Sequence, residues 1–357
     1  MMEVDPLIGK QLASFRVDRV AGRGGMATVY YGWDIKLDRP VAIKVIATNY
    51  AGDAAYAARF VNEARAIATW HHPNILQVYY ADDADGLYYY VMEYVQGQDL
   101  GVVLAGYRAE GQHMPQAEVL RIGRAVANAL DYAHQRGVIH RDVKPANVMV
   151  AEDGRVVLAD FGIAMNVAQG TMGTVFGSPH YFSPEQARSS ADVVPQSDLY
   201  SLGIMLYEML TGRLPFDDPS PVSLAMQQIQ NQPPSPRSIN PALSPAVEAV
   251  LLKALEKQPA NRYQTGRQLM DALGLAFDLA EPTLPFLERP PAPASGPRPP
   301  ITRERRPPVA ARGAAVGGLF TSVAAGLRAA WDRVRANPAW RWVAGGAVVL
   351  LAAAILI

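Results

Sequence analysis

The chain has 357 residues, half of them apolar, and equal numbers of basic and acidic residues give it a formal net charge of zero. This length is more than one domain usually needs, and the neutral charge argues against a general nucleic-acid-binding protein. The sequence has no cysteine, which excludes disulfide scaffolds, thiolate metal sites and cysteine nucleophiles. The opening stretch MMEVDPLIGK has no basic region followed by an apolar run, so no signal peptide is predicted.

The first part of the chain, residues 13–95, is predicted to be rich in β-strands. FRVDRV and ATVYYGW flank a cluster of glycines, and RPVAIKVI and GLYYYVMEYV have the composition of further strands. One helix, at about 54–69, is expected to interrupt them. These patterns predict a small β-rich lobe.

Residues 96–278 are predicted to form a larger, mainly helical lobe. One helix is expected to begin at Pro115 and to end at Gly137. Another is expected to follow Ser197 and to run to Gly212. The second helix is apolar on nearly every face, so it should be buried. The overall prediction is therefore an α+β, bilobal protein.

The composition changes after the predicted helical lobe. Residues 281–312 contain ten prolines, which predicts a semi-stiff linker. Apolar residues then recur every three or four positions in 313–338, the pattern of an amphipathic helix. We interpret 340–357 as a transmembrane segment, because residues 342–357 carry no charge. Sixteen residues are slightly short for a bilayer core of about 30 Å, so a buried helix is the alternative.

The charges before this apolar segment predict its orientation. Residues 301–341 hold eight arginines against Glu304 and Asp332, a balance of +6. Arginine at the end of a spanning helix is retained on the cytoplasmic side, and Trp340 and Trp342 stand where interfacial aromatics are expected. The sequence therefore predicts a cell-membrane protein with a single C-terminal anchor and cytoplasmic lobes, in contact with membrane lipid.

The glycine cluster AGRGGMATVY has glycines at 22, 24 and 25 between two strands. Backbone without a Cβ atom can approach a phosphate group closely and offer N–H groups to it. A simple hairpin turn is the alternative, because glycine is common in such turns. Gly22, Gly24 and Gly25 are therefore candidate phosphate-binding residues whose role depends on the rest of the site.

A lysine on a strand and a glutamate on the expected helix form a candidate pair. Alternation within VAIK places Val41 and Ile43 on one face of the strand and Lys44 on the other. Glu63 falls on the apolar face of the helix at 54–69. Because a carboxylate directed into a core needs a cation, we expect Glu63 to pair with Lys44 and to direct its ammonium at phosphate oxygens.

The segment HRDVKPANV, residues 140–148, groups three cationic or titratable side chains around one acid, Asp142. A salt-bridged surface loop is the alternative interpretation. Asn147 and Asp160, thirteen residues apart, offer the oxygen ligands that Mg²⁺ prefers. Phosphate transfer requires positioning and charge neutralisation. We therefore expect Asp142 to orient an attacking hydroxyl, Lys144 to neutralise the transferred phosphate, and Asn147 and Asp160 to hold the metal.

Six motifs in register resemble those of bacterial eukaryotic-like serine/threonine protein kinases: the glycine loop, VAIK, Glu63, HRDVKPAN, DFG and SPE. The resemblance covers residues 13–278. HHPNI, SDLYSLG and NRYQT are also typical of the group, and Lys144 resembles the serine/threonine class. One position departs from the pattern, because Ala27 replaces the third glycine of the loop.

The resemblance implies roles for further residues. It implies Met92 as gatekeeper and a structural, non-catalytic Glu185–Arg262 pair, and it implies that Asp198 braces the HRD backbone. The adenine is expected to lie between apolar side chains and against the hinge backbone, contributed by Val29, Ala42, Glu93, Val95 and Met149.

The implied function is serine/threonine protein kinase activity, with transfer of the ATP γ-phosphate to protein hydroxyls. ATP and Mg²⁺ are the expected cofactors, with Mn²⁺ as an alternative metal, and protein substrates are the expected partners. We also expect autophosphorylation at Thr171 or Thr174, between two copies in a homodimer. Two alternatives are a pseudokinase-like nucleotide-binding signalling scaffold, which the complete set of motif residues disfavours, and a small-molecule kinase, which the segment ending SPHYFSPE disfavours.

Overall fold

The computed structural model describes residues 5–24, 27–46, 64–65, 67–84, 86–161 and 179–278. Several predictions fall outside these ranges. They concern Gly25, Glu63, Thr171 and Thr174, most of the helix at 54–69, and the segments 281–312, 313–338 and 340–357. No helix within the described ranges is both long enough and apolar enough to cross a membrane.

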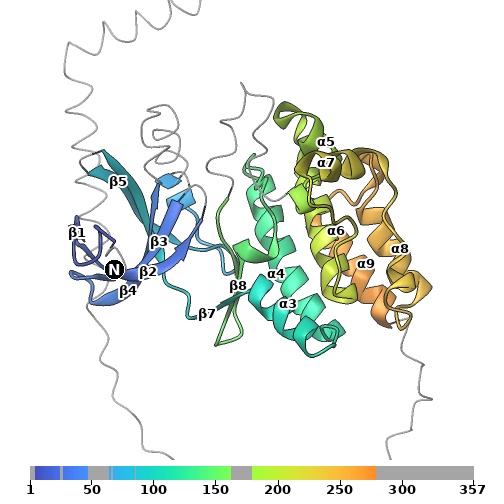
Figure 1. Ribbon diagram of the computed structural model, residues 1–357, viewed down its shortest axis with the longest axis horizontal. Coiled ribbons are helices and arrows are strands. Elements are labelled where there is room, and N and C mark those ends of the chain that lie inside the picture. The colour runs from blue at the N-terminus through green and yellow to red at the C-terminus, as the bar shows by residue number, and fades with distance from the viewer. Residues whose placement is uncertain are drawn as a thin grey trace, which may run out of the picture. The chain divides into compact units, whose positions relative to one another are not determined.

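The amino-terminal lobe is a six-stranded antiparallel sheet with the order β1-β2-β3-β4-β6-β5 (Figure 1). The strands are β1 (Gln11–Leu12), β2 (Phe15–Arg23), β3 (Ala27–Asp34), β4 (Arg39–Ile46), β5 (Val78–Ala84) and β6 (Leu87–Glu93). Pairing therefore begins two residues before the predicted boundary at residue 13.

The two faces of this sheet contribute to different apolar clusters. Val41 and Ile43 of β4 are fully buried in a cluster confined to the sheet-rich lobe. Ala42, on the opposite face, belongs to the large cluster that continues into the helical lobe. The period-2 alternation of VAIK thus places Lys44 on the face of Ala42, as predicted.

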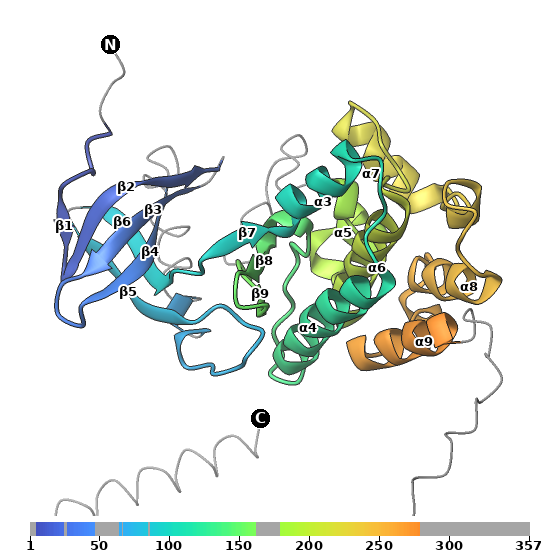
Figure 2. The same cartoon turned by 90° about the horizontal axis from the view of Figure 1, so that it is seen from below.

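The carboxy-terminal lobe is mainly helical (Figure 2). Its helices are α3 (Leu100–Ala109), α4 (Gln116–His134), α5 (Pro184–Arg188), α6 (Pro195–Thr211), α7 (Pro221–Gln230), α8 (Pro245–Ala254) and α9 (Gly266–Asp278). A small sheet of β7 (Gly97–Asp99), β8 (Val148–Ala151) and β9 (Val156–Leu158) lies beside them. The protein therefore has a sheet-rich lobe followed by a helical lobe.

Two helix boundaries differ slightly from the sequence prediction. Helix α4 ends at His134, and Gly137 supplies a left-handed φ of 74° in the turn that follows. Helix α6 begins at Pro195, before Ser197, because proline fits the first turn of a helix, where no N–H bond is lost. It ends at Thr211, and Gly212, with a left-handed φ of 71°, is its C-cap.

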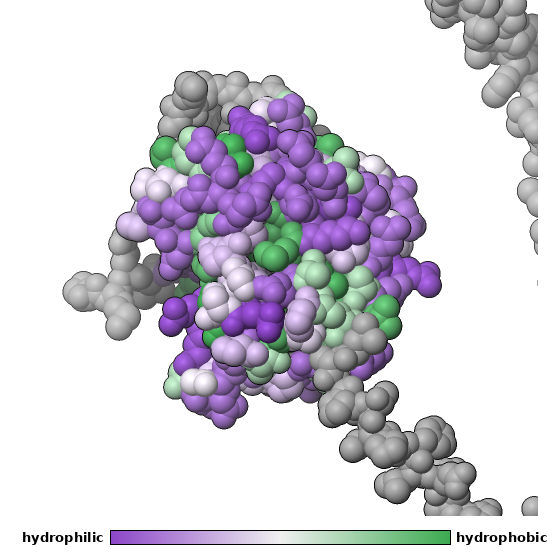
Figure 3. Space-filling view, turned by 90° about the vertical axis from the view of Figure 1, so that its right-hand side faces the viewer, coloured by the Kyte–Doolittle hydropathy of each residue, from purple (hydrophilic) through white to green (hydrophobic). Residues whose placement is uncertain are grey.

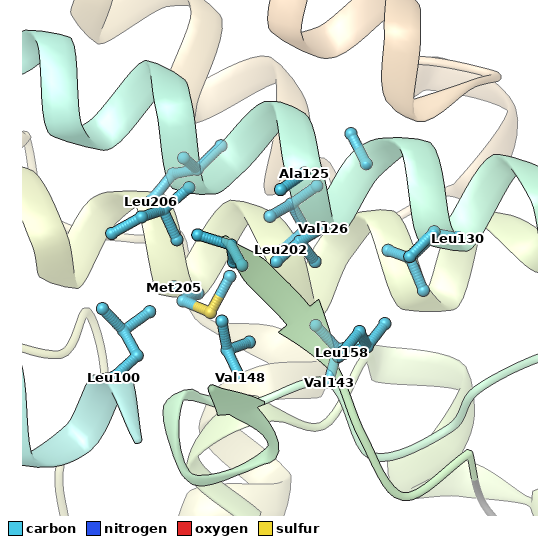
Figure 4. Close-up of a cluster of buried hydrophobic side chains, with 14 of the residues drawn as sticks. Leu100, Ala125, Val126, Leu130, Val143, Val148, Leu158, Leu202, Met205 and Leu206 are labelled. Carbon is cyan, nitrogen blue, oxygen red and sulfur yellow. The ribbon is translucent and has the colours of Figure 1, made fainter. Parts of the chain in front are cut away.

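The core of the helical lobe lies between α3, α4, α6 and the β8–β9 hairpin (Figure 4). All residues of α6 from Ser197 to Thr211 are buried, as predicted from a sequence that is apolar on nearly every face. The hairpin contributes Val148 and Leu158, both fully buried. This packing fixes the two loops that precede β8 and follow β9.

The outer surface of the helical lobe is mostly hydrophilic, with scattered apolar areas (Figure 3). Among the exposed large apolar side chains of the described residues are Val222 and Met226 on α7 and Leu275 on α9. Single exposed apolar residues of this kind are normal on the surface of a folded protein.

Candidate active site

The loop 140–147 gathers two polar side chains, those of Lys144 and Asn147, around Asp142. The Lys144 ammonium lies 2.8 Å from Asp142 Oδ2 and 3.0 Å from Oδ1. The Asn147 amide donates to Asp142 Oδ2 at 2.9 Å and to the Asp142 carbonyl at 2.7 Å. The structure therefore brings together the acid, the cation and the amide that the sequence singled out.

His140 has a packing role in this loop. Its side chain is fully buried, and its Nδ1 accepts from the Asp142 N–H at 3.2 Å. Nε2 therefore carries the proton and donates to the Ala159 carbonyl at 2.9 Å. Burial lowers the pKa of His140, although Asp198 and Asp142 act in the opposite direction. The ring stays neutral and connects the loop to the segment before Asp160.

Asp198, in the first turn of α6, holds the backbone of the loop. Its carboxylate accepts from the backbone N–H groups of His140 and Arg141, both at 2.8 Å. His134 Nε2 lies 2.7 Å from the same carboxylate. The bracing contact predicted for Asp198 is therefore present, and Arg141 takes a left-handed φ of 68° beside it.

Asp160 lies two residues beyond β9 with a left-handed φ of 57°. Its Oδ1 is 2.6 Å from the Lys44 ammonium and accepts from the Tyr90 hydroxyl at 3.0 Å. Burial opposes ionisation of Asp160, but the Lys44 charge and these two hydrogen bonds outweigh it and keep the pKa below its usual value. Asp160 is therefore a carboxylate at neutral pH.

The Lys44 partner in the described residues differs from the one proposed from the sequence. Lys44 pairs with Asp160, whereas Glu63 lies outside the described residues. The neighbouring residues Ala64 and Ile67 are buried at 0% and 6% exposure. Their burial agrees with the apolar face expected for that helix, and the Lys44–Glu63 pair stays a prediction.

The side chains expected around an adenine share one apolar cluster. Ala42 and Met92 are paired across β4 and β6, and both belong to the large core cluster together with Val95. Val29 and Met149 are partly buried against that cluster. The structure thus brings together residues from the sheet-rich lobe, the connection after β6 and strand β8.

The hinge residue Glu93 has a defined place at the end of β6. Its backbone N–H donates to the Gln77 carbonyl at 2.9 Å. Its side chain forms an ion pair with Arg155 of the β8–β9 hairpin. This pair links the two lobes on either side of the apolar cluster.

The described part of the glycine loop leaves space next to its backbone. A Cβ atom added at Gly22 would meet nothing within 4 Å, and Gly24 N–H donates to the Ala27 carbonyl at 2.9 Å. Neither glycine has a positive φ, so backbone conformation does not require glycine at these positions, and their binding of a phosphate stays a prediction. Ala27 fits its position in β3, at 7% exposure.

The donor set fits a hard divalent cation. No hydrogen bond from a described residue reaches Asp160 Oδ2, and the Asp160 side chain is 32% exposed. The Asn147 side-chain nitrogen donates to Asp142, so the side-chain oxygen Oδ1 is the atom that would bind a metal. Ala159, which precedes Asp160, donates its N–H to the backbone carbonyl of Asn147 at 2.8 Å. Carboxylate and amide oxygens suit Mg²⁺ or Mn²⁺.

The structural ion pair expected between Glu185 and Arg262 is also present, and it is buried. Arg262 donates to both oxygens of Glu185, at 2.7 and 2.8 Å, and Ser197 donates to Glu185 at 2.6 Å. Glu185 and Arg262 are 5% and 3% exposed. This bidentate pair joins α5 to the loop before α9.

Two site residues were missed by the sequence analysis. Tyr90 donates to Asp160. Its position two residues before Met92, on the same face of a strand, could have indicated that its side chain lies near the site. Asp5, before the predicted lobe, pairs with Arg23 of the glycine loop at 2.6 Å and accepts from Tyr30. No short-range pattern marks Asp5, because its partners are 18 and 25 residues away.

A sheet-rich lobe, a helical lobe and this set of lysine, acids and asparagine together define a bilobal kinase fold. The chain belongs to the protein kinase domain family, whose pattern matches residues 15–272. The resemblance stated from the motifs is therefore confirmed.

Its relatives include named bacterial enzymes. Serine/threonine-protein kinase PrkC of Bacillus subtilis is 42% identical over 276 residues, which cover 76% of this chain. Serine/threonine-protein kinase PknB of Mycobacterium leprae is 41% identical over 263 residues, or 71% of this chain. The chain spans 42% of the length of each of these relatives.

A solved structure shows the same fold. The crystal structure of the Mycobacterium tuberculosis PknI kinase domain is 33% identical with a TM-score of 0.62. The match covers 75% of this chain and 98% of that domain.

Proposed function

We propose that this protein is a serine/threonine protein kinase that transfers the γ-phosphate of ATP to hydroxyl groups of proteins. The observation that carries the proposal is the pair of clusters joined through Ala159: Asp142 with Lys144 and Asn147, and Asp160 with Lys44. The names of the relatives that share the domain also support it.

The role that we propose for Asp142 is to act on the acceptor. Its carboxylate is held on both oxygens, by Lys144 and Asn147, so its orientation is fixed before a substrate arrives. We therefore propose that Asp142 orients the attacking hydroxyl and accepts its proton late, while Lys144 offsets negative charge on the phosphoryl group.

The second cluster serves the nucleotide. Lys44 would hold phosphate oxygens, and Asn147 and Asp160 would hold the divalent cation. When bound, this cation supplies charge neutralisation of the phosphate oxygens. Val29, Ala42, Met149 and the backbone at Glu93 and Val95 would hold the adenine.

The test of this function is phosphate transfer from radiolabelled ATP and Mg²⁺ to the protein itself and to a generic protein acceptor, followed by mapping of the modified residues. The expected product is phosphoserine or phosphothreonine. A protein that binds ATP but gives no labelled protein would instead support the nucleotide-binding scaffold.

We further propose that the protein phosphorylates itself at Thr171 or Thr174, in trans between two copies. A phosphate carries about −1.5 to −2 charges at neutral pH and can order a loop through an arginine, and Arg141 adjoins the catalytic acid in the sequence. Mass spectrometry of protein produced in active form should find one of the two threonines modified. The Asp142→Asn variant is the control, and active protein with neither threonine modified would contradict this proposal.

We also propose that residues 340–357 anchor the protein in the cell membrane and that 313–338 lies on the anionic inner leaflet, with the kinase domain in the cytoplasm. The support is the sequence alone: the uncharged run 342–357 and the balance of +6 in 301–341. Full-length protein should stay with membranes after a carbonate wash, and a chain ending at 278 should be released. Full-length protein in the wash supernatant, or a domain cut by protease outside intact cells, would exclude the anchor.

A further inference from the structure

The Tyr90 side chain approaches Asp160 from the sheet-rich lobe. Tyr90 is on β6, is 2% exposed, and is paired with Lys44 across β4 and β6. Its hydroxyl donates to Asp160 Oδ1 at 3.0 Å, and the Lys44 ammonium lies 5.8 Å from the centre of its ring. A buried phenol therefore adds a second donor to a carboxylate that already has a cation.

The two donors use the same oxygen of Asp160. Lys44 and Tyr90 both contact Oδ1, and no hydrogen bond from a described residue reaches Oδ2. This arrangement fixes the plane of the carboxylate and directs one oxygen away from its protein partners. An oriented carboxylate oxygen that no described residue occupies suits a hard divalent cation.

The two donors differ in how firmly they are held. Lys44 has a flexible four-carbon stem and, under the proposed function, must also contact nucleotide phosphates. Tyr90 is buried and its ring has only two side-chain torsions. Asp160 itself lies beyond the last residue of β9, so no strand pairing fixes it. A rigid donor is therefore needed to keep Asp160 in place when the ammonium turns to the phosphates.

We infer that Tyr90 is a positioning residue for Asp160, which it holds in the orientation that binds the metal of a metal–nucleotide complex. This inference rests on the proposed function, because it assumes that Asp160 is a metal ligand. Hydrogen bonds from residues that contact a metal ligand, but not the metal, orient that ligand. Their loss commonly lowers metal affinity by about 10–100-fold.

The test compares ATP binding with and without Mg²⁺ by calorimetry in Tyr90→Phe and in the unaltered protein. Tyr90→Phe removes only the hydroxyl. We expect ATP affinity in the presence of Mg²⁺ to fall about tenfold, equal to about 1.4 kcal/mol, and metal-free ATP affinity to be unchanged. The free Mg²⁺ concentration that gives half-maximal phosphate transfer should rise by a similar factor.

Tyr89→Phe is the matched control. Tyr89 is the adjacent residue, 1% exposed, and belongs to the cluster confined to the sheet-rich lobe, so its hydroxyl is remote from Asp160. Tyr89→Phe should change neither metal-dependent binding nor half-saturation by Mg²⁺. Equal losses in both tyrosine variants would show a general packing effect and would overturn the inference.

A double-variant comparison shows whether Tyr90 acts through Asp160. In an Asp160→Asn background, Tyr90→Phe should have no further effect on metal-dependent ATP binding. The positioning role is refuted if Tyr90→Phe leaves the Mg²⁺ response unchanged, or if it lowers ATP affinity equally with and without Mg²⁺. Either result would leave the proposed function standing. If the unaltered protein shows no Mg²⁺-dependent ATP binding, the proposed function itself fails.

Discussion

Replacement of Asp160 by Asn is expected to remove nearly all phosphate transfer, with a fall in kcat of at least about 10²–10³-fold. The amide keeps the size of the side chain but loses the charge that would hold a divalent cation. It also removes the carboxylate that lies 2.6 Å from the partly buried Lys44 ammonium. The measurement is transfer of labelled phosphate from ATP and Mg²⁺ to a protein acceptor.

Asp271→Asn is a suitable control because Asp271 is an acid on α9 that is 66% exposed and lies 3.5 Å from Arg267. It should retain full activity. Both variants should show a cooperative thermal unfolding transition, which would show that a loss of phosphate transfer is not caused by unfolding. Lys44→Ala and Asp142→Asn should also lose most transfer. Full activity of Asp160→Asn with Mg²⁺ would show that Asp160 is not a metal ligand.

Replacement of Arg262 by Ala is expected to cause the largest loss of stability. It leaves Glu185 buried at 5% exposure without the cation that holds both of its oxygens. Breaking a buried ion pair on one side costs about 3–5 kcal/mol, which for a domain of this size lowers Tm by roughly 6–20 °C. Thermal unfolding of the purified kinase domain would measure this loss.

The pH dependence of this loss follows from Glu185. Burial opposes its ionisation, but Arg262 and Ser197 outweigh burial and lower its pKa in the folded protein. The pair therefore stabilises the fold above the unfolded-state pKa of about 4.3, and this stabilisation is lost as pH falls through the lowered folded-state value. The difference between Arg262→Ala and the unaltered protein should be largest at neutral pH and should shrink in acid.

Arg267→Ala provides the comparison for an exposed pair. Arg267 and Asp271 are 83% and 66% exposed, and such surface pairs contribute about 0–1 kcal/mol. Its Tm should therefore stay close to that of the unaltered protein. An Arg262→Ala variant that melts as high as Arg267→Ala would show that the buried pair has no structural role.

The sequence by itself determined the family, the two lobes and most of the candidate site. Motifs such as HRDVKPAN specify their own local geometry, because Asp142, Lys144 and Asn147 are within five residues of one another and meet in one turn. Helix boundaries followed from local chemistry as well, as at Gly212, where the chain needs a left-handed residue. The Glu185–Arg262 pair came from the family resemblance and not from spacing, since 77 residues separate its members.

Only the tertiary structure decided which distant side chains touch. Tyr90 meets Asp160 across 70 residues, His134 meets Asp198 across 64, and Asp5 meets Arg23 of the glycine loop. Each contact depends on how strands and helices pack against each other, which periodicity does not encode. Burial then fixed the chemistry: a neutral His140 and an ionised Asp160 result from the balance between loss of water and nearby charges, and that balance exists only after the chain has folded.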